Sequence, residues 1–311
     1  MNKTEGFFEG WYYKLQKGDA TLALIPSHHR EEDGSESGCL QVITPDTSFA
    51  LPFDGSLCRF SADPLVLSLD RCHFSSQGLT LSLDRNNTRL RGHVRFGPLT
   101  PIEKSRFMPD IMGPFSYFPA MQCRHDVLSM GHSLSGMLEV CGKTYDFTGG
   151  RGYLEKDAGV SFPRSWLWTQ CNDFDADCSV MLASADVPFL GGSFRGLICV
   201  VQALGREYRF ATYNGARLKT ALCGEREAIL EVARGPLALK LNVIHPAGRA
   251  LLAPKNGRMD RMIREAPACK MILRLSSHGQ TVLHTEGEHA GFEFVEAEKT
   301  VRRPLHRGLK A

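Results

Sequence analysis

Short runs in which apolar and polar residues alternate recur along the chain, and they constrain its fold more than any other feature. Residues 79–84 (LTLSLD) and 237–242 (LALKLN) both carry leucine at every second position. Other strand-like runs lie at 38–43, 65–69 and 271–275, with Gly, Asp, Asn and Pro between them. A period of two is that of a strand with one buried face. Many such runs between turn residues predict an all-β barrel or sandwich.

Several of these runs occur in the same order in the two halves of the chain. Residues 79–84 match residues 237–242, and residues 142–144 (GKT) match residues 279–281 (GQT). Near the start of each half an aromatic cluster, WYYK or WLWT, precedes an apolar run. Ordered self-similarity of this kind predicts an internal duplication.

We therefore expect two related antiparallel β-domains, residues 1–150 and 151–303, followed by a basic tail of residues 304–311. One stretch conflicts with this reading, because residues 225–233 have the composition of a helix. Their counterpart near residues 64–69 is strand-like, so we favour a strand there.

Residues 98–126 have no counterpart in the second half and are expected to be an insertion in the first domain. A loop of this length in a compact domain is more often functional than idle. We expect its Met112, Phe115 and Tyr117 to form an apolar lid over a ligand cavity. The alternative is that these side chains close the open end of a barrel as ordinary core.

Composition indicates a globular protein without a nucleic-acid partner, since the net charge is only +3 over 311 residues. No uncharged apolar stretch approaches the ~18 residues of a membrane-spanning helix. The best candidate, residues 187–204, contains Arg195. We therefore expect no integral membrane span, although peripheral contact with a membrane stays open.

The chain start and the cysteines bear on the compartment. The first ten residues lack the apolar run of a secretory signal. The ten cysteines form no CxxC pair, so neither a zinc site nor a disulfide framework is indicated. We expect reduced, mostly buried thiols, a cytoplasmic location, no metal site and no cofactor.

The segment at residues 149–170 concentrates chemically active side chains. It holds Glu155, Lys156, Asp157 and two of the three tryptophans, Trp166 and Trp168. Such acids are almost never fully buried unless they are paired. In a strand, Tyr153, Glu155 and Asp157 would share one face, and carboxyl groups two residues apart could raise the pKa of one of them. The alternatives are a solvated turn or a structural ion pair for the charged residues, and plain core for the tryptophans.

Six motifs together resemble the tocopherol cyclase family: FFEGWYYK at 7–14, MGPFSY at 112–117, MGHSLSG at 130–136, GRGYLEKD at 150–157, WLWTQ at 166–170 and YRFATY at 208–213. The resemblance spans nearly the whole chain and implies two tandem lipocalin-like β-barrels. It also extends, more distantly, to carotenoid hydratases. Family members commonly continue Glu-Lys-Asp with Trp, where this chain has Ala158, and the hydratase histidine falls on Lys156. We therefore expect a bacterial member of unknown substrate rather than a true vitamin E enzyme.

The family chemistry closes a chroman ring: an alkene of a prenyl tail is protonated, and a phenol oxygen captures the cation. The resemblance implies an isomerase or lyase acting on a prenylated quinol or related isoprenoid by ring closure or hydration. It assigns catalysis to Asp157, assisted by Glu155 and Lys156. The expected ligand-binding residues are Trp11, Tyr13, Met112, Phe115, Tyr117, His132, Tyr153, Trp166, Trp168 and Gln170. The alternative function is a non-catalytic carrier or sensor of an apolar molecule, which the same barrels could serve without any acid.

Overall fold

The alternating runs form strands, and the strands form two antiparallel sheets of twelve and ten strands. The structure, a computed structural model, describes residues 6–62, 65–85, 87–118, 121–189 and 191–296. These residues contain no α-helix and three short 3₁₀ helices, η1 (Gly55–Leu57), η2 (Gly113–Tyr117) and η3 (Thr212–Asn214). None of them forms a helix long and apolar enough to cross a membrane. The predicted tail, 304–311, lies outside the described residues.

The first sheet runs in the order β4-β3-β2-β1-β12-β10-β9-β8-β7-β6-β5, with β11 paired to β10. Its strands are β1 (Phe7–Lys17), β2 (Ala20–Arg30), β3 (Glu36–Ile43), β4 (Ser48–Asp54), β5 (Cys58–Ala62), β6 (Leu65–Leu69), β7 (Cys72–Ser75), β8 (Gly78–Arg85), β9 (Thr88–Phe96), β10 (Cys123–Val140), β11 (Lys143–Asp146) and β12 (Arg151–Gly159).

The second sheet runs in the order β16-β15-β14-β13-β22-β21-β19-β18-β17, with β20 paired to β21. Its strands are β13 (Trp166–Cys171), β14 (Cys178–Phe189), β15 (Gly192–Ala203), β16 (Arg206–Ala211), β17 (Arg217–Cys223), β18 (Glu227–Arg234), β19 (Leu237–Ile244), β20 (Arg249–Lys255), β21 (Arg258–Ser277) and β22 (Gln280–Val295). The stretch with helical composition at 225–233 is largely β18, so the favoured strand is confirmed.

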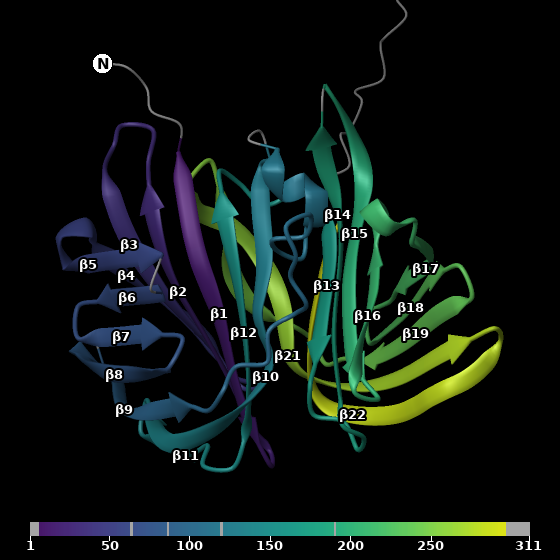
Figure 1. The fold of residues 1–311 in the computed structure, drawn as a ribbon. Helices are drawn as coiled ribbons and strands as arrows, with labels where there is room; N and C mark the ends of the chain where they lie inside the picture. Colours follow the sequence, from purple (N-terminus) through teal and green to yellow (C-terminus); the bar gives the residue numbers. More distant parts are fainter. Residues whose placement is uncertain (1–5, 63–64, 86, 119–120, 190, 297–311) are drawn as a thin grey trace, which may run out of the picture.

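The two sheets follow the same path, which confirms the predicted pair of lipocalin-like barrels related by duplication. Strand order relates β1 to β13, β12 to β22 and β10 to β21. Each sheet curls around its own interior, and the two stand side by side with β1, β12 and β10 facing β13 and β14 (Figure 1). The β10–β11 and β21–β22 hairpins even share their turn: Cys141-Gly142 and His278-Gly279 all have positive φ, as two-residue hairpin loops require.

Two details of the predicted duplication are wrong. Residues 79–84 lie in β8 and residues 237–242 in β19, but β19 occupies the position of β9. A leucine at every second position marks any strand on a core, so it does not identify which strand. The division at residue 150 also shifts, because β12 pairs with β1 and β10. The chain leaves the first sheet only after Gly159.

Equivalent strands of the two barrels meet across the interface. The rings of Tyr12 and Trp168 lie 5.3 Å apart, Lys14 Nζ donates to Gln170 Oε1 at 3.1 Å, and Gln16 Nε2 donates to Asn172 Oδ1 at 2.8 Å. Aligning Trp11 with Trp166 is therefore wrong by one residue. In strands a slip of one residue moves every side chain to the other face, and Trp11 indeed packs inside the first barrel, 5.2 Å from Phe60.

Apolar side chains fill three separate volumes. One cluster occupies the interior of the first barrel and another that of the second. A third, which we call the inter-barrel layer, lies between the sheets and comprises Tyr12, Ala23, Ile43, Ile102, Ile111, Val127, Met130, Tyr153, Trp166, Trp168, Met181, Val200, Leu251, Ala253 and Ile263. All ten cysteines are free, and six of them are buried.

Close strand packing makes Gly92 a sensitive position. Its φ is +115°, and a Cβ there would lie 2.3 Å from the carbonyl oxygen of Met137 on β10. We expect Gly92→Ala to lower the free energy of unfolding by roughly 2–4 kcal/mol, because it adds overlap to backbone strain. Gly149 is the matched control, because its φ is +82° but a Cβ there would meet no atom of a non-adjacent residue within 4 Å. Gly149→Ala should lower the free energy of unfolding by about 1 kcal/mol. Urea denaturation measures the free energy of unfolding of both variants. Equal decreases would contradict the close approach of β10 at Gly92.

Candidate active site

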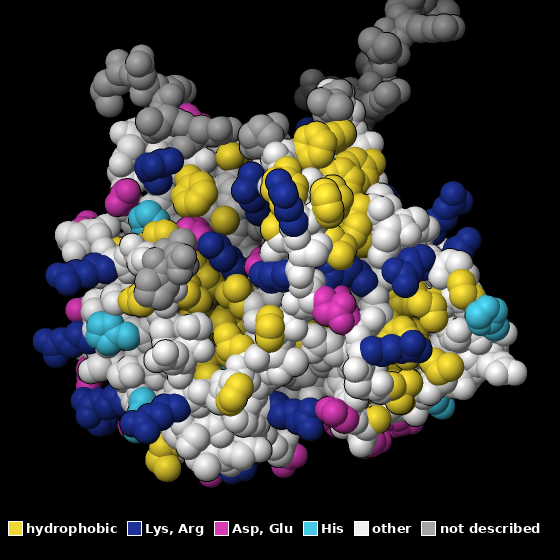
Figure 2. Space-filling model, viewed as in Figure 1, with side chains coloured by type: hydrophobic (Ala, Val, Ile, Leu, Met, Phe, Trp, Pro, Cys, Tyr) yellow, Lys and Arg dark blue, Asp and Glu magenta, His cyan; other side chains and the backbone are white. Residues whose placement is uncertain are grey.

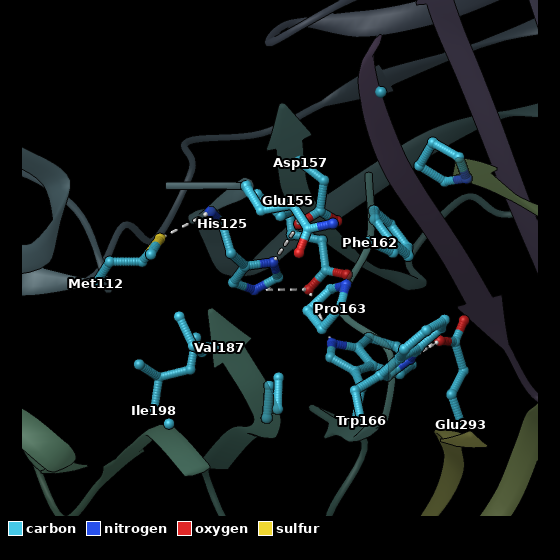
Figure 3. Close-up of a pocket in the computed structure, with 18 of the residues that line it drawn as sticks. Met112, His125, Glu155, Asp157, Phe162, Pro163, Trp166, Val187, Ile198 and Glu293 are labelled. Atoms are coloured by element: carbon cyan, nitrogen blue, oxygen red, sulfur yellow. Dashed lines mark hydrogen bonds and ion pairs between the residues drawn. The ribbon is translucent and has the colours of Figure 1, made fainter. Parts of the chain in front are cut away.

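An apolar cavity of about 210 Å³ lies between the two barrels rather than inside either one. Its walls come from β1, β2, β3, β10 and β12 of the first sheet and from β13, β14, β15 and β20–β22 of the second. Figure 3 shows His125, Glu155 and Asp157 gathered on one side and Trp166 with Glu293 on the other. The duplication thus builds a site to which both barrels contribute.

The face of β12 that points to the cavity carries the two predicted acids. Glu155 and Asp157 line the cavity, and Tyr153 lies beside them in the inter-barrel layer. Lys156 points the other way, as strand alternation requires. There it pairs with Glu9 and lies 5.4 Å from the ring of Trp11. Lys156 is therefore separated from the acids that it was expected to assist.

Glu155 is a buried carboxyl group with defined partners. Its Oε2 accepts hydrogen bonds from Tyr153 Oη at 2.6 Å and from Trp168 Nε1 at 3.1 Å. Burial raises the pKa of Glu155 to about 7, the charge of Asp157 adds to that rise, and His125 opposes it. Glu155 is thus divided between acid and carboxylate near neutral pH.

His125 connects the two acids, and sequence reasoning missed it. Its Nδ1 lies 2.9 Å from Asp157 Oδ1, and its Nε2 lies 3.6 Å from Glu155 Oε2. Burial alone would lower the pKa of His125, but Asp157 and Glu155 outweigh burial and raise it to about 9. The only feature of the sequence that pointed to His125 was its place in the insertion. The β10–β12 register pairs His125 with Asp157 and so brings it to the site.

Two more acids on the second sheet were also missed. Glu293 lines the cavity and accepts from Trp166 Nε1 at 2.8 Å. Glu265 is completely buried beside it and accepts from Tyr12 Oη at 2.5 Å. Burial raises the pKa of both groups, that of Glu265 to about 7. Nothing in the local sequence marks either residue, because each shares its long strand with other acids: Asp260 on β21, and Glu286 and Glu288 on β22.

Aromatic rings cover much of the cavity wall. Tyr12, Trp166, Trp168, Phe8 and Phe162 all line it. The Trp166 ring lies 5.4 Å from that of Phe162 and beneath the Arg261 guanidinium, at 4.9 Å. Ring faces of this kind stabilise a nearby cation.

The insertion contributes part of the cavity wall. Met112 and Phe115 line the cavity, together with residues 121–123. Phe115 stacks on Phe194 at 5.4 Å, next to Phe189 at the end of β14. Figure 2 shows hydrophobic side chains gathered over the upper ends of β14 and β15, with lysines and arginines around them. Tyr117 does not belong to this wall, because it is 60% exposed and donates to the carbonyl of Arg106.

Other predicted ligand-binding residues lie away from the cavity. Tyr13 packs on Phe74 and Phe96 inside the first barrel. His132 is buried 4.5 Å from the Phe96 ring. Gln170 accepts from Lys14 deeper in the interface. Trp11 borders the cavity, although its ring belongs to the first barrel. Of the ten expected ligand-binding residues, five line the cavity: Met112, Phe115, Trp11, Trp166 and Trp168. Tyr153 does not line it but donates a hydrogen bond to Glu155, which does.

The cluster of His125, Glu155 and Asp157 also has the spacing of a metal site, with one atom of each residue within 4.8 Å of the others. One histidine with two carboxylates would suit iron or zinc. Hydrogen bonds already link this cluster, since His125 Nδ1 is bonded to Asp157 and Glu155 Oε2 accepts from Tyr153 and Trp168, whereas His125 Nε2 has no hydrogen-bond partner among the described residues. We interpret the cluster as a group that shares protons.

Comparison with known proteins bears on the family. The sequence pattern described as tocopherol cyclase-like matches residues 77–295, more than half of the chain. The chain belongs to the tocopherol cyclase-like family. A protein named "Probable tocopherol cyclase, chloroplastic" from Oryza sativa subsp. japonica is 34% identical over 74 residues. That match covers 24% of this chain and 16% of the rice protein.

Solved structures share the fold of this family member at low sequence identity. Kievitone hydratase from Nectria haematococca is 9% identical, with a TM-score of 0.55, and the match covers 94% of this chain and 89% of that one. CghA is 11% identical with a TM-score of 0.61, covering 94% and 88%. A second CghA structure, with Sch210972, gives a TM-score of 0.60 at 10% identity over 94% and 89%. The chain therefore has the fold of cyclase- and hydratase-type lipocalin-like proteins.

Proposed function

We propose that this protein is an enzyme that protonates an alkene of an apolar, prenylated quinol or related isoprenoid and so promotes ring closure. The observation that carries the proposal is Glu155: a carboxyl group with a pKa of about 7, in the wall of an apolar cavity lined by tryptophans. A neutral carboxylic acid in an apolar site is the donor that such chemistry needs. Membership of the tocopherol cyclase-like family supports the substrate class.

The steps balance without a cofactor. The O–H bond of Glu155 breaks and a C–H bond forms on the alkene, which leaves a tertiary cation beside a carboxylate. Tyr12, Trp166 and Trp168 stabilise the cation through their ring faces. The phenol oxygen then forms a C–O bond and loses its proton to a carboxylate, so the net reaction is an isomerisation. Water at the same cation would give hydration instead, and the apolar wall favours the phenol by excluding water.

The other residues of the cluster have distinct roles in this scheme. Asp157 holds the His125 ring at 2.9 Å and is a positioning residue, a change from its expected role as the acid. His125, with a pKa of about 9, is cationic at neutral pH and stabilises the carboxylate that Glu155 becomes. Lys156 has no part in the step, because it faces the interior of the first barrel.

The size of the cavity limits how the substrate is held. About 210 Å³ is less than the ~300–1,000 Å³ of typical ligand sites. We propose that the reacting ring and the first alkene occupy the cavity while the remaining tail leaves past Phe115 and Phe194. The ten free cysteines support a reducing, cytoplasmic location, with peripheral contact at a membrane where such a substrate would dissolve.

A carrier of apolar molecules is the second candidate, since the cavity alone would serve that role. One experiment distinguishes the enzyme from the carrier. The protein is incubated with a prenylated hydroquinone, and the extract is analysed by chromatography and mass spectrometry. We expect a product of unchanged mass that has lost one phenolic hydroxyl. A product heavier by one water would identify a hydratase. Bound but unconverted hydroquinone would support the carrier and contradict the enzyme.

A further inference from the structure

A pair of acids on the second sheet lies outside the scheme described so far. Glu265 on β21 and Glu293 on β22 stand directly opposite each other in the strand register. Like charges at such positions destabilise a sheet, and two buried carboxylates in contact cannot both ionise near neutral pH. The structure nevertheless buries Glu265 completely. The pair is therefore stable only if it keeps a proton.

The hydrogen bonds of the pair agree with one shared proton. Tyr12 Oη donates to Glu265 Oε1, and Trp166 Nε1 donates to Glu293 Oε2. Glu265 Oε2 is buried, and no donor among the described residues reaches it. Because the Glu293 carboxyl group stands opposite Glu265 in the strand register, one proton shared by the pair would give Glu265 Oε2 the partner that it lacks. Two linked carboxyl groups of this kind titrate as a unit.

Strand order shows that this pair mirrors the Glu155 site. Glu155 on β12 is paired with Tyr12 on β1, and Glu293 on β22 is paired with Trp168 on β13. Because β12 corresponds to β22 and β1 to β13, Glu155 and Glu293 hold equivalent positions. The donors cross over: Trp168 of the second barrel serves Glu155, and Tyr12 of the first serves Glu265. The duplication thus places one acid on each wall of a single cavity.

We propose that Glu293, held in a proton-sharing pair with Glu265, is a second acid–base residue of the cavity and takes the proton that the nucleophile releases. This inference rests on the proposed function and completes its proton balance. Glu155 gives a proton to the alkene on one wall. The phenol O–H breaks as its oxygen bonds to the cation, and that proton goes to the Glu293–Glu265 pair. When product leaves, water returns the proton from the pair to Glu155.

The two glutamates have different roles. Glu293 lines the cavity and reaches the substrate, whereas Glu265 lies behind it. Glu265 is therefore a positioning residue that acts through the proton it shares. Removing Glu265 should change the pH at which Glu293 accepts a proton while Glu293 still reaches the substrate.

Three substitutions test the inference: Glu293→Gln, Glu265→Gln and Glu293→Asp. In the ligand-free protein, infrared spectroscopy at neutral pH should show the C=O stretch of a protonated carboxyl group that shifts or disappears in both glutamine variants and that Glu293→Asp retains. With a prenylated hydroquinone, Glu293→Gln should lower kcat by about 10²–10⁴-fold with little change in KM. Glu293→Asp should also lower kcat, because the shorter side chain holds its carboxyl group farther from the substrate. Glu265→Gln should keep measurable turnover with a shifted pH profile.

Several results would overturn the inference. An unchanged infrared band in both glutamine variants would show that the pair shares no proton. Normal turnover by Glu293→Gln alongside an inactive Glu155→Gln would remove Glu293 from the reaction and leave the proposed function intact. No turnover by the wild-type protein would defeat the proposed function and the role of Glu293 together. Thermal unfolding of each variant checks folding, and if Glu293→Gln fails to fold, Glu293→Asp supplies the decision.

Discussion

Replacing Glu155 by glutamine is expected to lower turnover of a prenylated hydroquinone by about 10²–10⁴-fold, the usual worth of a general acid. Glutamine keeps the shape of the protonated side chain, and its carbonyl oxygen can still accept from Tyr153 and Trp168. It has no acidic proton to give. Affinity for the ligand should therefore change little, which fluorescence quenching of the cavity tryptophans measures beside the product assay.

Two further variants make this test specific. Glu286→Gln alters an acid of β22 that pairs with Lys270 on the surface, and it should leave turnover unchanged. Asp157→Asn should reduce turnover by less than Glu155→Gln, because asparagine still accepts from His125 and leaves the acid in place. If Asp157→Asn were the more damaging change, Asp157 rather than Glu155 would be the proton donor.

Turnover is expected to fall as the pH rises through about 7, which is the pKa of Glu155. The active form of Glu155 is the neutral acid, so this residue is fully competent below its pKa and loses its function above it. At pH 9 a single acid of this kind retains about one hundredth of its protonated form. His125 keeps its proton over most of that range, with a pKa of about 9. A profile of kcat against pH measures the midpoint.

The midpoint should respond to His125 in a defined direction. The charge of His125 lowers the pKa of Glu155, so His125→Gln should move the fall in kcat to higher pH. A midpoint that stays in place, or a profile that rises with pH, would contradict Glu155 as the acid.

Much of the fold could be predicted from local sequence, because strand alternation is a local property. The two sheets follow from alternating runs such as residues 79–84 and 237–242, although these two runs are not equivalent strands of the duplication. Register between distant strands is not local, so Trp11 was aligned with Trp166 although Tyr12 and Trp168 are the residues that meet. The same limit set the domain division at residue 150, since only pairing with β1 and β10 shows where β12 belongs.

The candidate site was predictable in part for the same reason. Glu155, Asp157, Trp166 and Trp168 lie within one short segment rich in such residues, so a pattern marked them. His125, Glu265 and Glu293 lie far apart in the sequence and join the site only through strand pairing and the packing of one barrel on the other. Lys156 lies between the two acids in the sequence, but strand alternation places its side chain on the opposite face of β12. Adjacency in the sequence therefore did not predict its position.

Deuterium incorporation tests the central claim, that an acid of this cavity protonates an alkene, most directly. The reaction of a prenylated hydroquinone is run in D₂O, and the cyclised product is analysed by mass spectrometry and NMR. We predict one deuterium bound to carbon. It should lie on the alkene carbon adjacent to the one that bonds to the phenol oxygen. Glu155→Gln should give almost no product. A cyclised product without deuterium on carbon, or ligand that stays bound and unconverted, would contradict the claim.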